Sequence, residues 1–173
     1  MKVELPDAEA TTRLGQVIAP LLAPGDSLLL YGPLGMGKST LARGLIRTLT
    51  TPDEEVPSPT FTLVQFYECN PPIAHFDLYR LTRPEEAFEI GLDEALDEGC
   101  VVIEWPERLG DDPGRFLGPD QLIIHLSEIT LDAASERPQA DGLCEPVDGA
   151  LQGRLATVSG VGRWETGLKE LYV

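Results

Sequence analysis

Apolar residues near the start of the chain recur with the spacing of one helix face. After Asp7 they stand at i, i+3, i+4, i+7 and i+8, and these positions are Leu14, Val17, Ile18, Leu21 and Leu22. Asp7 is a suitable N-cap because its carboxylate can accept a hydrogen bond from an amide of the first turn. The turn residues "APGD" end the pattern. We therefore predict an amphipathic helix that follows Asp7.

A short, continuous apolar run follows at residues 27–31 ("SLLLY"), with turn residues on both sides. Such a run is typical of a strand that is buried on both faces. The next periodic positions are Leu41, Leu45 and Leu49, which predict a helix that begins inside the glycine-rich stretch before them. A strand, a glycine-rich turn and a helix thus follow one another directly.

The rest of the chain alternates between extended and helical patterns. "RPEEAFEIGLDEAL" predicts short helices broken at Gly91. Further runs predict strands: "TFTLVQFY", "IAHFDL", "CVVIEW", "QLIIHL" and "RLATVSG". Strands that alternate with helices indicate an α/β fold, with a mostly parallel central sheet and helices on both faces. We expect the last two strands to form a C-terminal β-hairpin, and ligands to bind at the carboxyl ends of the parallel strands.

The chain length sets the number of domains. With 173 residues the chain favours one globular unit over two, so we treat residues 1–173 as a single domain. Residues 127–153, between the last two predicted strands, are acidic, contain Pro and Gly, and lack sustained periodicity. We expect this segment to be a surface insertion or a mobile loop without chemistry of its own.

Charge and cysteine content exclude several classes of protein. Lys and Arg number 13 against 29 Asp and Glu, so the formal net charge is −16, which excludes a broad basic face for nucleic acid. Any RNA would have to be held by a partner. The cysteines, Cys69, Cys100 and Cys144, match neither a zinc spacing nor a disulfide framework. No segment has the pattern of an export signal or a membrane span, so we expect a cytoplasmic protein without membrane association.

The glycine-rich stretch satisfies the phosphate-binding motif G-x-x-x-x-G-K-[ST] at residues 32–39, between a predicted strand and a predicted helix. Glycine is required because the loop must turn its backbone N–H groups, among them those of Gly35, Met36 and Gly37, toward a polyphosphate. The dipole of the following helix favours the same anion. Lys38 can then reach the β- and γ-phosphates, while the Ser39 hydroxyl ligates Mg²⁺. An ordinary glycine-rich turn is the alternative, and the flanking strand and helix argue against it.

Hydrolysis needs groups besides a phosphate loop, because Mg²⁺ requires a carboxylate and the attacking water an orienting group. Asp77 follows "IAHF" and Glu104 follows "VVI", so we expect both at the carboxyl ends of strands beside the loop. Either acid can hold the metal while the other positions water. The residues themselves leave this open, and each acid could instead cap a loop or pair with an arginine.

The stretch "VPSPTFTLV" at residues 56–64 is a stiff connection that carries hydroxyl groups. Two prolines flank Ser58 and restrict the backbone, and Thr60 follows in a segment that resumes as a strand. Two interpretations stay open. The stretch can be a switch loop whose hydroxyl contacts Mg²⁺ or the γ-phosphate and lets go after hydrolysis, or a rigid turn before an edge strand.

Taken in order, these stretches resemble the TsaE (YjeE) family, small P-loop ATPases required for threonylcarbamoyladenosine formation on transfer RNA. The matching stretches are "LPDAEATTRLG", "GPLGMGKSTLARG", "VPSPTFTLV", "HFDLYRL", "EIGLDEAL" and "VVIEWPERL". The resemblance runs from Leu5 to Leu109. It departs from the family at Pro33, where aspartate is usual, and at Met36, where alanine is frequent; neither removes a group that the phosphate chemistry needs.

The resemblance implies roles for the site residues. Lys38 and Ser39 bind phosphate and Mg²⁺, with Thr40 beside them on the phosphates. Asp77 corresponds to the family's functional aspartate, and Glu104 to the glutamate implicated in Mg²⁺ binding. The other positions are Thr60 in the switch-like loop, Trp105 near the nucleotide, Arg154 near the phosphates, and Glu9 to Thr11 bordering the base. For Trp105 the residue type equally suits a core aromatic at a strand end.

The resemblance also implies cofactors and partners. ATP and Mg²⁺ are the expected cofactors, and the protein is expected to dock onto the TsaB–TsaD pair, of which TsaD is the threonylcarbamoyl transferase. ATP hydrolysis would permit repeated turnover, and transfer RNA would be met only through the complex. The acidic chain agrees with this indirect role. No arginine is obviously placed as an internal finger, so we expect slow hydrolysis by the isolated protein and stimulation by its partners.

Three other functions compete with this interpretation. A small-molecule kinase can use the same loop, although the few arginines in the middle of the chain, such as Arg80 and Arg83, argue against the charged lid that such kinases need. A guanine-nucleotide switch ranks lower because no N-K-x-D stretch occurs. The third alternative is a module that binds nucleotide without cleaving it, which is distinguished from an ATPase because it releases no phosphate.

Overall fold

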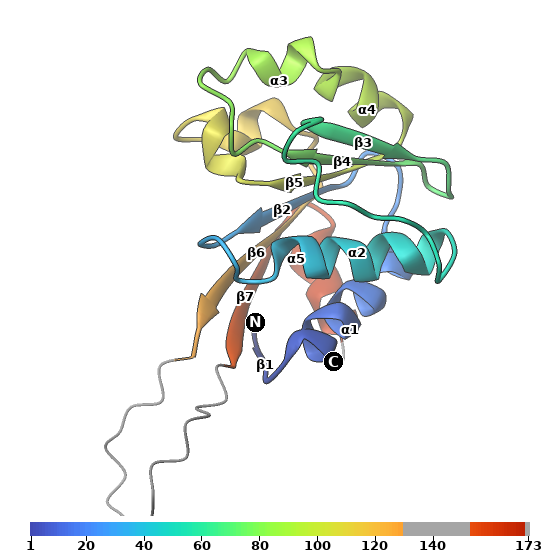
Figure 1. The fold of residues 1–173 in the computed structure, drawn as a ribbon, viewed down its shortest axis with the longest axis vertical. Helices are drawn as coiled ribbons and strands as arrows, with labels where there is room; N and C mark the ends of the chain where they lie inside the picture. The colour runs from blue at the N-terminus through green and yellow to red at the C-terminus, as the bar shows by residue number, and fades with distance from the viewer. Residues whose placement is uncertain (130–152, 172–173) are drawn as a thin grey trace, which may run out of the picture.

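One mixed sheet organises the part of the chain that the structure, a computed structural model, describes, which is residues 1–129 and 153–171 (Figure 1). Its strand order is β1-β7-β6-β2-β5-β4-β3. The strands are β1 (Lys2–Leu5), β2 (Ser27–Tyr31), β3 (Val64–Tyr67), β4 (Ile73–Asp77), β5 (Cys100–Glu104), β6 (Gln121–Glu128) and β7 (Arg154–Val161). The helices are α1 (Ala8–Ile18), α2 (Lys38–Leu49), α3 (Glu86–Glu89), α4 (Leu92–Glu98) and α5 (Trp164–Gly167).

The centre of the sheet is parallel and its edges are antiparallel. β6, β2, β5 and β4 run in the same direction, whereas β3 pairs antiparallel with β4, and β7 pairs antiparallel with both β6 and β1. β6 and β7 form the expected C-terminal hairpin, from Gln121 opposite Val161 to Glu128 opposite Arg154. The predicted α/β class, with a parallel centre and this hairpin, is confirmed.

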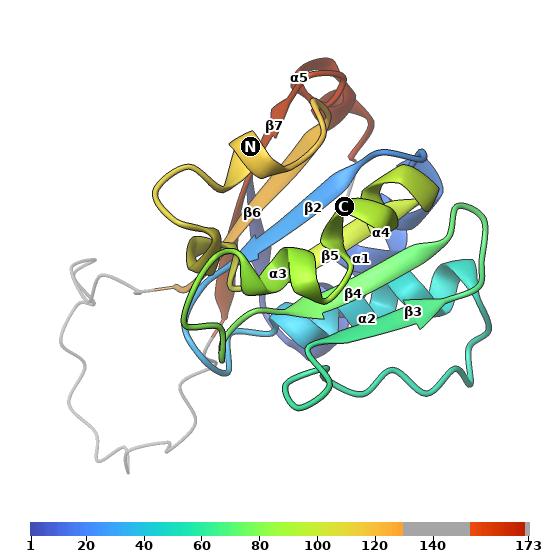
Figure 2. The same ribbon diagram turned by 90° about the horizontal axis from the view of Figure 1, so that it is seen from above.

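Helices cover both faces of the sheet, as predicted. α1 and α2 lie side by side on one face, and α3 and α4 lie on the other (Figures 1 and 2). Two separate clusters of buried apolar side chains correspond to these two faces. Short 3₁₀ turns complete the connections: η1 (Ala19–Leu21), η2 (Pro106–Leu109), η3 (Pro113–Phe116) and η4 (Leu168–Glu170). None of the helices in the described ranges is both long and apolar enough to cross a bilayer.

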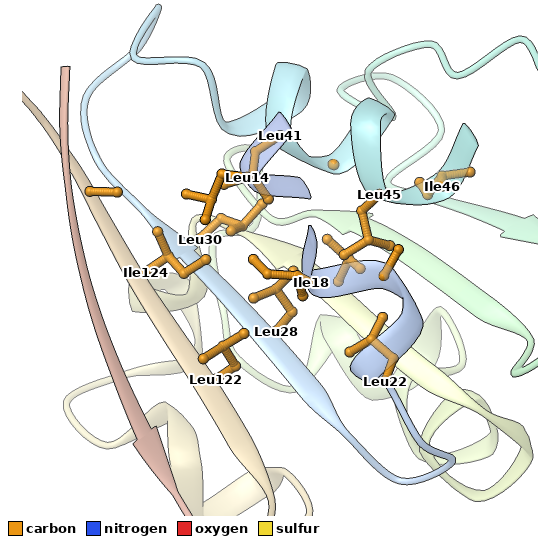
Figure 3. Close-up of a cluster of buried hydrophobic side chains, with 14 of the residues drawn as sticks. Leu14, Ile18, Leu22, Leu28, Leu30, Leu41, Leu45, Ile46, Leu122 and Ile124 are labelled. Carbon is orange, nitrogen blue, oxygen red and sulfur yellow. The ribbon is translucent and has the colours of Figure 1, made fainter. Parts of the chain in front are cut away.

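The larger core joins α1 and α2 to β2 and β6 (Figure 3). Leucine and isoleucine side chains from these four elements meet there and are fully buried: Leu14, Ile18, Leu28, Leu30, Leu41, Leu45, Leu122 and Ile124. Burying one such side chain contributes about 1.5–3 kcal/mol, so this cluster fixes α2 against β2. The loop between β2 and α2 is therefore held at both ends by packed elements.

The first helix begins where its cap was predicted. Asp7 has an extended backbone, and its carboxylate accepts a hydrogen bond of 2.7 Å from the Ala10 amide. The regular helix ends at Ile18, before the last apolar positions of the predicted pattern. Pro20 lies inside the 3₁₀ turn that follows, and a proline has no N–H to continue the α-helical ladder.

α1 and α2 cross with their backbones in contact because two glycines face the crossing. A Cβ added at Gly44 would lie 2.4 Å from the carbonyl oxygen of Thr12, and one added at Gly15 would lie 2.2 Å from that of Leu41. Both distances are far below any normal contact. No side chain separates the two helices at these points, so α2 cannot move away from α1 without losing the contact.

Gly44→Ala is therefore expected to destabilise the protein. The new methyl group must push the helices apart, and such overpacking costs about 1–3 kcal/mol. For a chain of this size, the melting temperature should fall by roughly 2–4 °C per kcal/mol. Gly167→Ala is the matched control, because that glycine has φ −64° and its nearest atom would be a ring carbon at 3.4 Å. If Gly44→Ala and Gly167→Ala have equal melting temperatures, the backbones of α1 and α2 are not in close contact at Gly44.

Besides the earlier end of α1, the structure differs from the sequence-based expectation at β1, at the start of β3 and at the end of β6. β1 was not predicted. The predicted strand "TFTLVQFY" begins only at Val64, because residues 60–63 form a turn in which Leu63 has φ +66° and its amide donates to Pro59 O. The expected insertion at 127–153 begins later, since Ser127 and Glu128 still belong to β6. Residues 130–152, the bulk of that segment, lie outside the described residues.

Candidate functional site

The carboxyl ends of three adjacent parallel strands meet at one edge of the sheet. β2 lies beside β5, and β5 beside β4, so the loop that leaves Tyr31 is close to the last residues of the other two strands. Those last residues are Glu104 and Asp77, which stand directly opposite each other in the register. Both acids are almost fully buried, at 3% and 4% exposure. Strand order thus brings the two acids together beside the glycine-rich loop.

The loop from Gly32 to Gly37 has a backbone that other residues adopt only with strain. Gly32, Gly35 and Gly37 have φ values of +137°, +82° and +97°. Gly37 is the N-cap of α2 and offers no side chain there, so the first amides of the helix are left for a ligand. The glycines of the motif are therefore required by the backbone path as well as by the open space that it leaves.

Lys38 lies at the start of α2 and is 4% exposed. Its ammonium group donates to Gly32 O at 2.5 Å and Pro33 O at 2.9 Å, and it lies 3.9 Å from the centre of the Trp105 ring. Burial lowers the pKa of Lys38, and the carboxylates of Glu104, Glu107 and Asp77 partly oppose this effect. A negatively charged group at this point would favour the charged lysine.

Ser39 and Glu104 are joined by a hydrogen bond. The Ser39 hydroxyl donates to Glu104 Oε2 at 3.0 Å. The other carboxylate oxygen, Oε1, lies 2.9 Å from His75 Nε2, and His75 is fully buried. A hydroxyl and a carboxylate thus stand together at the start of α2, and both are hard oxygen ligands of the kind that Mg²⁺ prefers.

Asp77 is bound to the loop that precedes β3. Its Oδ2 accepts a hydrogen bond from the Thr60 hydroxyl at 2.9 Å, and its Oδ1 accepts one from the Tyr79 amide at 3.0 Å. The Ser58 hydroxyl lies 2.8 Å from Thr60 Oγ1 and 3.5 Å from Asp77 Oδ2. The stretch flanked by prolines is therefore attached to the site through its hydroxyl groups. Of the two interpretations, a loop in contact with the site agrees better with these bonds.

Trp105 has the left-handed backbone conformation, with φ +60°, which is uncommon for a residue with a side chain. Its ring lies beside Lys38 and 4.9 Å from the Tyr79 ring, and it also packs against the smaller core cluster. Trp105 thus combines the two roles that its residue type allowed, a wall of the site and a core contact.

These groups line one cavity of about 420 Å³. Ten of the predicted site residues lie on its walls: Gly35, Gly37, Lys38, Ser39, Thr40, Thr60, Asp77, Glu104, Trp105 and Arg154. Arg154 reaches it from the first residue of β7, near Gly37. Another cavity of about 470 Å³ lies between β3, β4 and α4, and its lining contains no residue of the phosphate motif.

Three predicted residues are not on the cavity walls. The Met36 side chain packs against the larger core, and its amide donates to Pro33 O. Glu9 pairs with Arg13 at 2.7 Å on the exposed side of α1. Thr11 is buried, and its hydroxyl donates to Asp7 O, while its methyl group would be 3.2 Å from a Cβ at Gly37. For these residues, contact with a nucleotide stays a prediction.

Four residues at the site had no role assigned from the sequence, although the Ser58 hydroxyl was considered as part of the possible switch loop. Leu34, Ser58 and Tyr79 line the cavity, and His75 lies behind it on Glu104. Ser58 is two residues from Thr60 and Tyr79 is two residues from Asp77, so the stretches "SPT" and "DLY" could have indicated both as site residues. His75 begins the stretch "HFDLYRL", but the sequence did not reveal its role, because its contact with Glu104 depends on the pairing of β4 with β5.

The cavity fits a nucleoside triphosphate with Mg²⁺. The positive φ values and the bare N-cap leave backbone amides free for phosphate, Lys38 supplies the cation, and Ser39 with Glu104 supplies oxygen donors. A parallel sheet whose first central strand leads through such a loop into a helix defines the P-loop nucleoside triphosphatase fold.

The chain belongs to the TsaE family and so to tRNA threonylcarbamoyladenosine biosynthesis. The family model described as "Threonylcarbamoyl adenosine biosynthesis protein TsaE" matches residues 5–137. The tRNA threonylcarbamoyladenosine biosynthesis protein TsaE of Rickettsia conorii is 42% identical over 122 residues, which are 70% of this chain and 67% of that protein. The protein of the same name from Synechocystis sp. is 44% identical over 122 residues, 66% of this chain and 76% of its own. The predicted family is confirmed.

A solved structure agrees with this assignment. The crystal structure of Bacillus subtilus YdiB matches with a TM-score of 0.69 and 26% sequence identity, and the match covers 99% of this chain and 93% of that one. The similarity therefore extends beyond the motifs between Leu5 and Leu109 on which the sequence-based resemblance depended.

Proposed function

We propose that this protein is a Mg²⁺-dependent ATPase that serves threonylcarbamoylation of adenosine in transfer RNA by acting on a TsaB–TsaD complex. The observation that carries the proposal is the hydrogen bond of 3.0 Å between the Ser39 hydroxyl and the Glu104 carboxylate, directly beside Lys38. It supports the proposal because a hydroxyl and a carboxylate, both oxygen ligands that Mg²⁺ prefers, stand together beside the loop that would bind the β- and γ-phosphates.

Different residues of the chain would bind the phosphates and the metal ion. The loop amides and the start of α2 hold the phosphates, and Lys38 exchanges its bonds to the Gly32 and Pro33 carbonyls for phosphate oxygens. Ser39 and Glu104 would hold Mg²⁺, which when bound neutralises the charge that develops on the phosphates. Trp105 and Tyr79 form an aromatic wall beside Lys38.

Asp77 is the residue that we assign to orienting the attacking water. Its carboxylate lies at the cavity wall and is held by Thr60 and the Tyr79 amide, whereas Glu104 is the acid bound to Ser39. The two acids therefore differ in their neighbours. This difference supports metal binding by Glu104 and a general-base role for Asp77.

The acidic charge of the chain supports action on transfer RNA through partner proteins. The net charge of −16 opposes direct contact with an RNA backbone, so a basic partner surface would have to bring the RNA to the complex. Arg154 is the one arginine among the described residues that line the cavity. We expect slow hydrolysis by the isolated protein and stimulation by the partners, with Arg154 alone too little to complete the site.

Phosphate release measured with the purified full chain tests the proposal. We expect hydrolysis of ATP that requires Mg²⁺, stops in EDTA and rises when the TsaB–TsaD pair is added. A pull-down with the same pair, with and without ATP, tests docking separately. If the isolated protein hydrolyses ATP as fast as it does with the TsaB–TsaD pair, the partner dependence is contradicted. Transfer of the γ-phosphate to the hydroxyl group of a metabolite, in place of water, would favour the kinase alternative.

Thr60→Val is expected to lower the hydrolysis rate about tenfold. The change removes a hydrogen bond to a carboxylate, which contributes about 1.5–3 kcal/mol, here at the lower end because Thr60 is half-buried. Nucleotide affinity should change little, since Lys38 and the loop are intact. Thr62→Val is the control, because Thr62 is exposed on the same loop. Equal rates for both variants would exclude a role for the Thr60–Asp77 bond in turnover.

A further inference from the structure

His75 occupies the middle of β4 and is fully buried. Its Nε2 lies 2.9 Å from Glu104 Oε1. A carboxylate only accepts hydrogen bonds, so Nε2 carries the hydrogen. The other ring nitrogen, Nδ1, is buried and has no hydrogen-bond partner among the described residues. Glu104 is therefore the polar contact that the structure gives to this imidazole.

This arrangement is unfavourable if packing is the purpose of the side chain. Leaving a buried polar atom unpaired costs about 1–3 kcal/mol. The residues around His75 on the same face of the sheet are apolar, with Ile73 two positions before it and Val102 opposite it on β5. An aliphatic side chain at position 75 would fill the same space without that cost. The hydrogen bond to Glu104 is therefore the feature that can explain a histidine at this position.

The register explains how one carboxylate reaches two partners. His75 stands opposite Val102, and Asp77 stands opposite Glu104, so the side chains of all four share one face of the sheet. Glu104 lies between β4 and the start of α2. Its Oε1 is bound on the strand side by His75, and its Oε2 accepts the Ser39 hydroxyl on the helix side.

We propose that His75 is a positioning residue for Glu104: its Nε2–H fixes Oε1, so that Oε2 stays directed at the divalent cation that Ser39 and Glu104 would hold. The inference rests on the proposed function, because it assigns a support to the proposed metal ligand. Without the imidazole, the carboxylate can rotate and offer either oxygen. Supports of this kind typically contribute 10–100-fold to metal affinity.

Metal affinity measured without turnover tests the inference. The full-length chain is saturated with the nonhydrolysable analogue AMP-PNP, and Mn²⁺ is titrated by electron paramagnetic resonance. His75→Leu is expected to weaken Mn²⁺ binding about tenfold or more. AMP-PNP affinity in EDTA should stay within twofold of the wild type. His75→Gln, whose amide nitrogen can donate from nearly the same place as Nε2, should recover most of the loss.

Phe76→Leu controls for packing, because Phe76 is the next residue on β4, is fully buried and faces the other core. It should bind Mn²⁺ like the wild type. If His75→Leu binds Mn²⁺ as tightly as the wild type, the inference is wrong while the proposed function stands. Failure of His75→Gln to recover affinity would also overturn it. If the wild type binds neither AMP-PNP nor Mn²⁺, the proposed function itself fails.

A measurement on the wild-type protein tests the inference even if His75→Leu does not fold. The chain has two histidines, and the other, His125, is exposed. An imidazole N–H protected from solvent exchange should therefore come from His75 and appear in ¹⁵N-detected spectra. Its signal should shift when Mg²⁺ is added to the AMP-PNP complex. A signal that does not respond to Mg²⁺, or the absence of any protected imidazole N–H, would contradict the bond to Glu104.

Discussion

Lys38→Ala is expected to lower the affinity for Mg²⁺–ATP by about 100-fold and to abolish measurable hydrolysis. The ammonium group lies at the base of the loop, where it can bind phosphate oxygens in place of the Gly32 and Pro33 carbonyls. Hydrogen bonds from a charged donor contribute about 1.5–3 kcal/mol each, and a loss of about 3 kcal/mol corresponds to roughly 100-fold in affinity. Isothermal titration calorimetry with AMP-PNP and a phosphate-release assay provide the measurements.

Thermal unfolding separates this loss from misfolding. A Lys38→Ala variant that unfolds cooperatively near the melting temperature of the wild type shows that its loss of affinity does not come from misfolding. Lys2→Ala, on the exposed edge strand β1, serves as the control for charge. A Lys38→Ala variant that binds nucleotide like the wild type would refute the assignment of this cavity to phosphate.

Asp77→Asn is expected to lower kcat by a factor of about 10²–10⁴ while leaving nucleotide and metal affinity nearly unchanged. Removing a general base has an effect of this size. Asparagine has the same shape, and its carbonyl oxygen can still accept the Tyr79 amide, so the local fold should persist. Asp97→Asn is the control, because Asp97 is an exposed acid on α4.

Glu104→Gln provides the comparison that distinguishes the two acids. This variant should need a higher Mg²⁺ concentration for half-maximal hydrolysis, because Glu104 is the acid bound to Ser39. If Asp77→Asn changes the Mg²⁺ requirement and Glu104→Gln does not, the two roles are reversed. A steady-state assay over a range of Mg²⁺ concentrations decides between these outcomes.

The centre of the site could be predicted from sequence because its parts are local or follow from strand order. The phosphate loop is one continuous stretch, and its glycines are at the positions where the backbone has positive φ. Asp77 and Glu104 are distant in sequence, yet each ends an apolar run. Parallel strands place such ends at one edge, so their proximity required no knowledge of register.

Other features depended on contacts that a pattern does not reveal. The roles of Asp77 and Glu104 differ through their neighbours, and the bonds from Thr60 and Ser39 are set by packing between separate elements. His75 was missed for the same reason. β1 was missed because its alternating pattern lasts only four residues, and its position is fixed by antiparallel pairing with β7 near the end of the chain.

Trp105 gives the protein an internal optical reporter. The chain has two tryptophans, and the other, Trp164, is buried in the larger core at 1% exposure. When the cavity fills, a change in tryptophan emission, excited where tyrosine does not absorb, therefore reports on Trp105, whose ring lies 3.9 Å from the Lys38 ammonium. Unlabelled nucleotides can thus be titrated by emission alone, with Trp105→Phe as the blank.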